Sequence, residues 1–305
     1  MGTQTTAGTD WPTRIKQLIR TPDFWIVLIP MIYYGLLIRT EITFGDGPEL
    51  LVAMYNFGGA HPSGYPLFTL LGSIPAHMPG SAFWNVAFML SAVPGALVIW
   101  AIYKILREYG VGLTAAVVAG LAYGGSWHVA YQATRIEVYS LHCMLIGFAL
   151  LSLFRFMRVR TPLGPVQQPN IRLAYGAVLF TCLALTNHLT SAFLIVPVVA
   201  GLLLADHKRM LKPKPIAILC GIAAACAAIY LYLPLQALLN TGDRISWNDP
   251  STVERFWFHA TGQEYAIFRS TDLSKVLPTA EKIWNSANNT FFPGIIIISI
   301  IGAVD

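Results

Sequence analysis

Long apolar runs separated by short polar segments dominate the pattern of this chain. They cover residues 24–38, 65–75, 82–103, 111–130, 138–154 and 216–235, with two more between 172 and 206 that meet near Asn187 and His188. An apolar run of about 20 residues can cross the hydrocarbon core of a bilayer as a helix. The pattern therefore predicts an all-α integral membrane protein, a polytopic helical bundle of about eight spans.

The order of the runs also predicts the domain organisation. We expect residues 1–23 to form a cytoplasmic N-terminal segment and residues 24–305 to form a single transmembrane domain. No small-residue cleavage site follows the first run, so we expect it to remain as a signal anchor. The last run, Phe292–Asp305, is shorter than the roughly 20 residues that a span needs. We therefore expect an incomplete last span, as in a fragment of a longer protein.

Two segments on the outer side, residues 39–66 and 236–290, are longer than simple connections. In the first, Pro48 suits the first turn of a helix and Gly58-Gly59 would end it. This short helix carries apolar residues at helical spacing and is expected to lie along the membrane surface: Leu50, Leu51, Met54 and Phe57.

The second outer segment contains another predicted helix. Asp249-Pro250-Ser251 is a suitable helix start, and Gly262 would stop the helix. Its apolar face would consist of Val253, Phe256, Trp257 and Ala260.

Composition and charge agree with a membrane location. The chain is 55% hydrophobic and 11% charged, whereas soluble domains carry about 25% charged residues. With the N-terminus in the cytoplasm, inner segments hold 13 of the 20 Lys and Arg residues and outer segments hold 7, as the positive-inside rule requires. This distribution accounts for the net charge of +5. The expected environment is therefore the lipid bilayer, and no nucleic-acid partner is expected.

Candidate chemistry gathers in the first outer segment, which holds Glu41, Asp46, Glu49 and His61. An outward carboxylate suits a transferase with a lipid-linked phosphate donor, because the attacking hydroxyl must lose a proton. The leaving phosphate needs positive charge or N–H donors. The outer candidates for this role are Arg39, Arg135 and Arg244, with His188 or His61 as neutral or charged helpers.

Structural explanations compete with each of these assignments. Glu49 could only stabilise a first helical turn, and Asp46 could only shape a Gly-Asp-Gly turn. The segment from His61 to Pro66 could be a rigid turn, Arg135 could pair with Glu137, and His188 could satisfy helix ends. Trp and Tyr residues near the span ends would serve as interface anchors.

Five segments, in this order, resemble a family of polytopic membrane glycosyltransferases with the GT-C architecture. They are GDGPELLVAMYNFGGAHPSGYPLFTLLG at 45–72, TRIEVYSLH at 134–142, LTNHLT at 185–190, YLYLPLQA at 230–237 and WNDPSTVERFWFHATGQEY at 247–265. The animal member of this family is an endoplasmic-reticulum protein O-mannosyltransferase. This chain has Asp46-Gly47-Pro48-Glu49 where the family has Asp-Ser-Gly-Glu, and His61-Pro62-Ser63-Gly64 where the family has His-Pro-Pro-Gly.

The resemblance implies a function and a set of site residues. It implies transfer of a sugar from a polyprenyl-phosphate carrier to a protein or glycan hydroxyl on the outer or lumenal face, with inversion. The catalytic positions would be Asp46 as general base, with Glu49 and His61, and the substrate-binding positions Tyr65, Arg135, Glu137, His188 and Arg244. No cofactor is implied, and a divalent metal is not expected although the outer carboxylates could hold one.

Two other functions remain open from the sequence. A transporter or lipid flippase would show paired repeats and charged groups in the middle of spans, and the sequence shows neither. A scaffold or inactive truncated protein is compatible with the short last run. We expect a multi-pass protein of a bacterial-type plasma membrane rather than of the endoplasmic reticulum.

Overall fold

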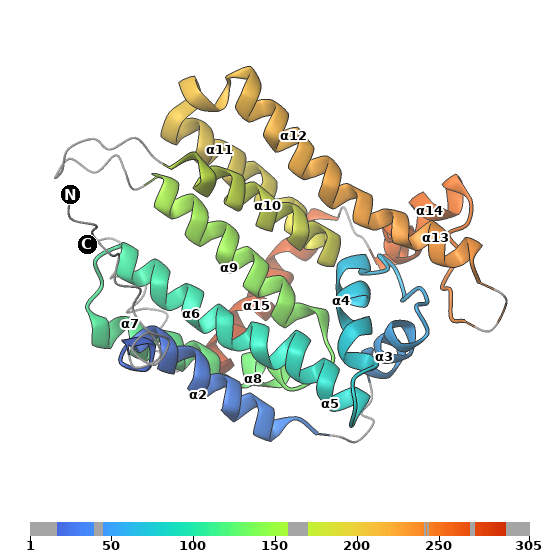
Figure 1. Ribbon diagram of the computed structural model, residues 1–305, viewed down its shortest axis with the longest axis horizontal. Coiled ribbons are helices and arrows are strands. Elements are labelled where there is room, and N and C mark those ends of the chain that lie inside the picture. Colours follow the sequence, from blue (N-terminus) through green and yellow to red (C-terminus); the bar gives the residue numbers. More distant parts are fainter. Residues whose placement is uncertain are drawn as a thin grey trace, which may run out of the picture.

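Long helices form the body of the protein. The computed structural model describes residues 17–39, 45–157, 170–240, 242, 244–268 and 272–290. Within them the chain is helical, and one isolated bridge joins Gly59 to Ser246. Helices α6 (Val93–Glu108), α9 (Val138–Met157), α10 (Ile171–Asn187) and α12 (Pro213–Ala227) pack side by side in this order and share one diagonal direction in Figure 1.

Further helices pack against this row. Helices α2 (Pro22–Leu37) and α7 (Leu113–Gly125) pack against α6, and α11 (Ala192–Met210) packs against α9. The buried Tyr34 hydroxyl of α2 donates a hydrogen bond of 2.7 Å to the Gly124 carbonyl of α7, where a Cβ atom would lie only 2.9 Å from that hydroxyl. The apolar core therefore extends across helices that are far apart in the sequence.

Among the described residues, four continuous helices are long and apolar enough to cross a membrane. They are Ala82–Glu108, Val138–Met157, Leu189–Met210 and Pro213–Leu238. Shorter apolar helices occupy Pro22–Leu37, Pro66–Ala76, Leu113–Gly125 and Ile171–Asn187. These helices indicate a multi-pass membrane protein, although only four of the roughly eight expected spans reach full length. The expected span at Phe292–Asp305 lies outside the described residues.

The prediction of one span over residues 111–130 is wrong. The chain leaves the helix at Ser126, which has an extended backbone, and α8 (Trp127–Ala133) begins directly after it. The Ser126 hydroxyl donates a hydrogen bond of 2.7 Å to the Tyr123 carbonyl. Such local bonding by serine competes with the continuing helix.

The predicted short helix of the first outer segment is confirmed as α3 (Gly47–Tyr55), and α4 (Pro66–Ala76) follows it. Its apolar face, however, packs on protein. Leu50 and Met54 are buried in the main core, and a Cβ atom added at Gly72 of α4 would lie 2.3 Å from the Met54 sulfur. The part of this segment at residues 40–44, which includes Glu41, lies outside the described residues.

The second outer segment, predicted at residues 236–290, begins within α13 (Tyr232–Leu238). Its helices are α14 (Val253–Ala260), η5 (Gln263–Phe268), η6 (Leu273–Lys275) and α15 (Val276–Thr290). Helix α14 begins later than predicted, because the Thr252 hydroxyl caps it by accepting from the Arg255 amide, while Asp249 and Ser251 form a turn. The predicted apolar face is only partly covered: Ala260 is buried, but Val253 is 76% exposed.

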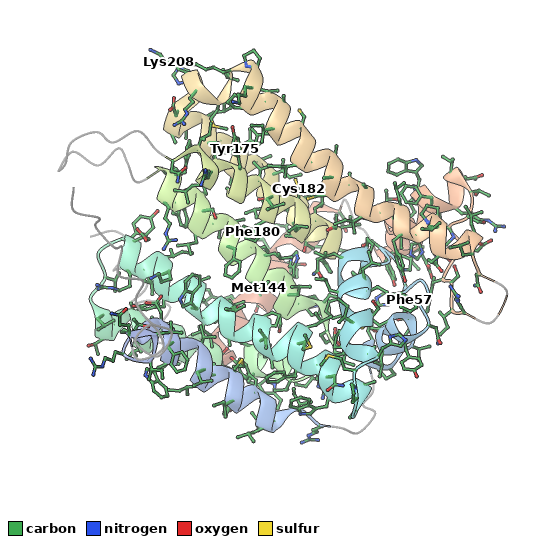
Figure 2. The ribbon with its side chains drawn as sticks, viewed as in Figure 1. Phe57, Met144, Tyr175, Phe180, Cys182 and Lys208 are labelled. Atoms are coloured by element: carbon green, nitrogen blue, oxygen red, sulfur yellow. The ribbon has the colours of Figure 1, made fainter. Side chains whose placement is uncertain are left out.

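The two ends of the helical row differ in charge. Figure 2 shows Lys208 near one end and Phe57, which follows α3, near the other. Lys208 lines a cavity of about 840 Å³ together with Arg209, Lys212 and Lys214. The end that carries α3 and α4 holds the candidate site.

Candidate active site

Asp46 lies at the start of α3 with its carboxylate free of the helix. It occupies the N-cap position, but its side chain makes no capping hydrogen bond. The side chain is 56% exposed. Turn and cap chemistry therefore do not account for this carboxylate, and it is accessible to a substrate.

Glu49 holds His61 through both carboxylate oxygens. Oε1 accepts a hydrogen bond of 2.7 Å from the His61 backbone N–H, and Oε2 lies 2.6 Å from the ring Nδ1. Only 23% of the Glu49 side chain is exposed. Glu49 therefore does more than stabilise a helical turn, because it fixes the position and the ring orientation of His61.

The other ring nitrogen of His61 faces the candidate base. Nε2 lies 3.0 Å from the Tyr65 hydroxyl and 3.7 Å from Asp46 Oδ2. Burial opposes protonation of the imidazole, but the hydrogen bond to Glu49 and the charges of Glu49, Asp46 and Glu137 outweigh it and raise the pKa of His61. The sequence-predicted group Asp46, Glu49, His61 and Tyr65 is thus brought together.

A third carboxyl group, that of Glu137, comes from the loop between α8 and α9. Burial and the charge of Asp46 raise the pKa of Glu137 to about 7, although Arg135 and His61 lower it. Within the described residues Arg135 and Glu137 form no ion pair, and the Arg135 guanidinium lies 3.8 Å from the centre of the Tyr131 ring. Glu137 therefore belongs electrostatically to the Asp46 cluster.

Arg135 also lines a cavity of about 500 Å³, to which Asp46, Glu49 and His61 do not contribute. Arg39 provides a second cation, and the other walls are mainly aromatic and apolar: Tyr33, Leu37, Phe83, Trp127 and Tyr131. Such a cavity offers both charge for an anionic group and apolar surface for a hydrocarbon chain.

His188 lies where α10 meets the next helical turn, as predicted, and its ring stacks on Tyr65 with centroids 5.8 Å apart. Its Nδ1 lies 2.9 Å from the Thr190 hydroxyl, which in turn lies 3.1 Å from His142 Nε2. His142 and Thr190 were not predicted from the sequence. Both lie within segments of the family resemblance, TRIEVYSLH and LTNHLT.

The second outer segment and α13 before it contact the turn that carries His61. Gly59 donates a hydrogen bond of 2.8 Å to the Ile245 carbonyl, and the Tyr232 hydroxyl donates one of 2.8 Å to the Gly58 carbonyl. Close to these hydrogen bonds, the rings of Trp247 and His61 form a T-shaped pair with centroids 6.1 Å apart. Trp247 was missed because an exposed Trp in an outer segment resembles an interface anchor.

Two further side chains complete this side of the site. His259 of α14 is fully buried, and burial lowers the pKa of His259 to about 4. The Ala60 backbone lies near its ring and favours protonation slightly, but neither ring nitrogen reaches hydrogen-bond geometry within the described residues. Arg244 lies near Tyr232. In the described part of the chain, no hydrogen bond or ion pair joins Arg244 to Asp46 or His61.

The described residues contain no group of three or more His, Cys, Asp or Glu side chains arranged to hold a metal ion. The site instead combines one exposed carboxylate, a buried carboxylate that holds a histidine, a third carboxyl group that titrates near neutrality, and aromatic rings. Such a set can accept a proton from a hydroxyl group.

Comparison with known proteins identifies the family. The model of the Protein O-mannosyl-transferase TMEM260 N-terminal domain matches residues 46–212. The chain belongs to this family. The range matched to the TMEM260 N-terminal domain contains the Asp46, Glu49 and His61 cluster, whereas Trp247 and His259 lie beyond it.

Curated relatives agree with this assignment. The chain is 28% identical over 249 residues to Protein O-mannosyl-transferase TMEM260 of Mus musculus, with 77% of this chain and 33% of the relative covered. It is 26% identical over 250 residues to the corresponding protein of Dictyostelium discoideum, with 78% and 30% covered. The chain thus spans about a third of the length of these TMEM260 relatives. No solved structure matches it.

Proposed function

We propose that this chain is a membrane-embedded glycosyltransferase of GT-C type. It moves a sugar, by family resemblance mannose, from a polyprenyl-phosphate-linked donor to a protein or glycan hydroxyl on the outer face of the membrane. The observation that carries the proposal is the exposed carboxylate of Asp46 beside His61, a histidine held through its backbone and ring by Glu49. Membership of a family named for protein O-mannosyl transfer supports the reaction class.

Asp46 acts as the general base in this scheme. Its carboxylate takes the proton of the acceptor hydroxyl while the hydroxyl oxygen forms a bond to the anomeric carbon. The bond from that carbon to the phosphate oxygen breaks, and its electron pair leaves with the phosphate, so a single displacement inverts the anomeric centre. His61 Nε2 lies 3.7 Å from Asp46 Oδ2, so a protonated ring places a positive charge beside the reacting carboxylate.

The remaining site residues bind the substrates. Arg135, together with Arg39 in the cavity of about 500 Å³, neutralises the donor phosphate, and the aromatic walls receive the first isoprenoid units. We assign Tyr65, Glu137 and His188 to sugar and phosphate oxygens, because all three lie beside the Asp46 and His61 cluster. Arg244 lies across the turn and is assigned to the acceptor. The scheme invokes no cofactor.

The test compares wild type with Asp46→Asn in nanodiscs, using radiolabelled polyprenyl-phosphate mannose and a Ser/Thr-containing acceptor peptide. General-base catalysis contributes roughly 10²–10⁴-fold, so we expect transfer to fall by about that factor while donor binding stays close to wild type. Asp272→Asn, at an exposed position of the second outer segment, is the matched control. Wild-type transfer rates in Asp46→Asn would exclude Asp46 as the base. A wild-type chain that binds no donor would favour the transporter or scaffold alternatives.

A further inference from the structure

Trp247 is held in a fixed orientation beside the catalytic cluster. Its indole N–H donates a hydrogen bond of 3.1 Å to Glu264 Oε2, and its backbone N–H donates one of 3.3 Å to the Gly59 carbonyl. The Asn248 side chain donates to the same Glu264 oxygen at 2.8 Å. Trp247 is therefore fixed at two points, through the indole N–H and through the backbone N–H.

The backbone after Trp247 adopts a conformation that few residues tolerate. Asn248 and Asp249 have φ angles of +57° and +43°. Asn and Asp are the side chains that visit this left-handed region most readily after glycine. The residue types at 248 and 249 thus allow the sharp reversal that brings Trp247 over the His61 turn and sends the chain on towards α14.

The exposed part of Trp247 is apolar. The residue is 39% exposed, and its only polar side-chain atom, Nε1, is bonded to Glu264. A tryptophan that anchors a protein at the membrane interface directs its hydrated indole N–H towards the headgroups. Here the N–H is bonded to a carboxylate of the protein itself, and the ring borders His61 at 6.1 Å. An apolar ring surface therefore adjoins the polar groups of the site.

A second aromatic residue lies in the same electrostatic environment. Tyr265 of η5 is 38% exposed. Partial burial and the charges of Glu264, Asp46 and Glu49 raise the pKa of Tyr265. Its phenol group is therefore close enough to the catalytic carboxylates to feel their charge, and it follows directly after the residue that anchors Trp247.

We propose that Trp247 is the floor of a pyranose-binding subsite, on which the transferred sugar stacks through its C–H face while Asp46 and His61 face its reacting edge. A pyranose presents C–H groups on one face and hydroxyl groups around its rim. Binding sites recognise such amphipathic ligands with aromatic surface and a few fixed polar groups. This assignment rests on the proposed function, and it makes the second outer segment responsible for recognising the sugar.

The test separates sugar recognition from lipid recognition. Binding of a mannose-bearing polyprenyl phosphate and of the same carrier without sugar is measured in nanodiscs for wild type, Trp247→Ala and Trp247→Phe. For Trp247→Ala we expect the Kd of the sugar-bearing donor to rise at least tenfold and that of the bare carrier to stay the same. Trp247→Phe keeps an aromatic face and should recover most of the affinity. Trp257→Ala, at a more exposed Trp of the same segment (57%), should bind both lipids as wild type does.

A second measurement uses only the wild-type chain, so its result does not depend on whether the variants fold. Oxidative footprinting with mass spectrometry should show Trp247 protected by the sugar-bearing donor and unprotected by the bare carrier. Equal protection by both lipids, or a Trp247→Ala variant that binds both as wild type does, would overturn the subsite while leaving the proposed function intact. A wild-type chain that does not distinguish the two lipids and transfers no sugar would overturn both.

Discussion

At the residue scale, the main feature of the site is how Glu49 controls His61. With Nδ1–H directed to the carboxylate, Nε2 of the neutral ring can accept from the Tyr65 hydroxyl. After protonation, Nε2–H can instead donate towards Tyr65 or face Asp46 at 3.7 Å. The charge on His61 therefore sets the strength of the electrostatic attraction between its ring and the Asp46 carboxylate.

Replacing Glu49 by Gln should move the alkaline limb of the pH–rate profile to lower pH. The pKa of His61 is raised mainly by its hydrogen bond to Glu49 and by the charge of that carboxylate, against the opposing effect of burial. The imidazolium is complete below its ordinary pKa and is lost as the pH rises through the raised value. Glutamine removes the charge, so the imidazolium is lost at lower pH. Transfer rates measured between about pH 5 and pH 9 would show the shift.

Glu137 is a second titrating group in the electrostatic environment of His61, so its effect on the pH–rate profile must be separated from that of His61. Burial and the charge of Asp46 raise the pKa of Glu137 to about 7, so the group is neutral below that pH and charged above it. Glu137→Gln removes this titration, and we expect the shift caused by Glu49→Gln to persist in the double variant. Glu254→Gln, an exposed change on α14, should leave the profile unchanged. An unaltered alkaline limb in Glu49→Gln would show that His61 does not set it.

Local sequence signals predicted one half of the site. Asp46, Glu49 and His61 lie within one short outer segment with clear turn residues, so their proximity could be expected. Trp247, Tyr265 and His259 reach the same place through contacts between segments almost 200 residues apart. Neither hydrophobic periodicity nor capping signals encode such long-range pairings.

At the scale of elements, the turn between α3 and α4 is where the first outer segment contacts α13 and the second outer segment. Gly64 has a φ of +83°, and Tyr65 after it is also left-handed at +41°. A Cβ atom added at Gly64 would lie 2.6 Å from Leu233 Cδ2 and 2.8 Å from His259 Nε2. Leu233 belongs to α13 and His259 to α14, so this glycine allows both helices to approach the turn that carries His61.

Gly64→Ala should therefore destabilise the protein by about 3 kcal/mol, because backbone strain and steric overlap act together. Gly80→Ala is the matched control. Its φ is +100°, and nothing lies within 4 Å of an added Cβ atom, so only the backbone cost of about 1–2 kcal/mol applies. Thermal midpoints in detergent, read from the monodisperse fraction, would compare the two. An equal decrease in thermal midpoint for the two variants would mean that α13 and α14 do not pack tightly against the turn.

The pattern predicted the existence of elements better than their boundaries. The apolar runs identified the helices at 24–38, 82–103 and 138–154 because their residues are apolar all around. The break at Ser126 was not predicted, because one extended residue does not change the average hydropathy of an apolar run. The start of α14 shifted because a threonine cap at Thr252 competes with Asp249 and Ser251.

At the scale of the whole molecule, charge distinguishes the two ends of the helical row. Helix α10 runs from Ile171, which lines the basic cavity of Lys208 and Lys212, to Asn187 beside the candidate site. Its 17 residues correspond to about 25 Å at 1.5 Å per residue, close to the thickness of the hydrocarbon core. The basic cavity and the carboxylate cluster therefore lie about one membrane thickness apart, as expected if they face opposite sides.

The positive-inside rule predicts an orientation in which the Lys208 end faces the cytoplasm and the Phe57 end faces outside. A cysteine replacing Phe57, which is 46% exposed, should react with a membrane-impermeant maleimide added to intact cells. A cysteine replacing Lys208 should react only after permeabilisation. Both belong in a background without the four native cysteines, all of which are free thiols. The two labelled positions flank opposite ends of the bundle (Figure 2), so the reverse labelling pattern would invert the topology and put the proposed transfer site on the cytoplasmic face, where Asp46 could not serve an outer acceptor.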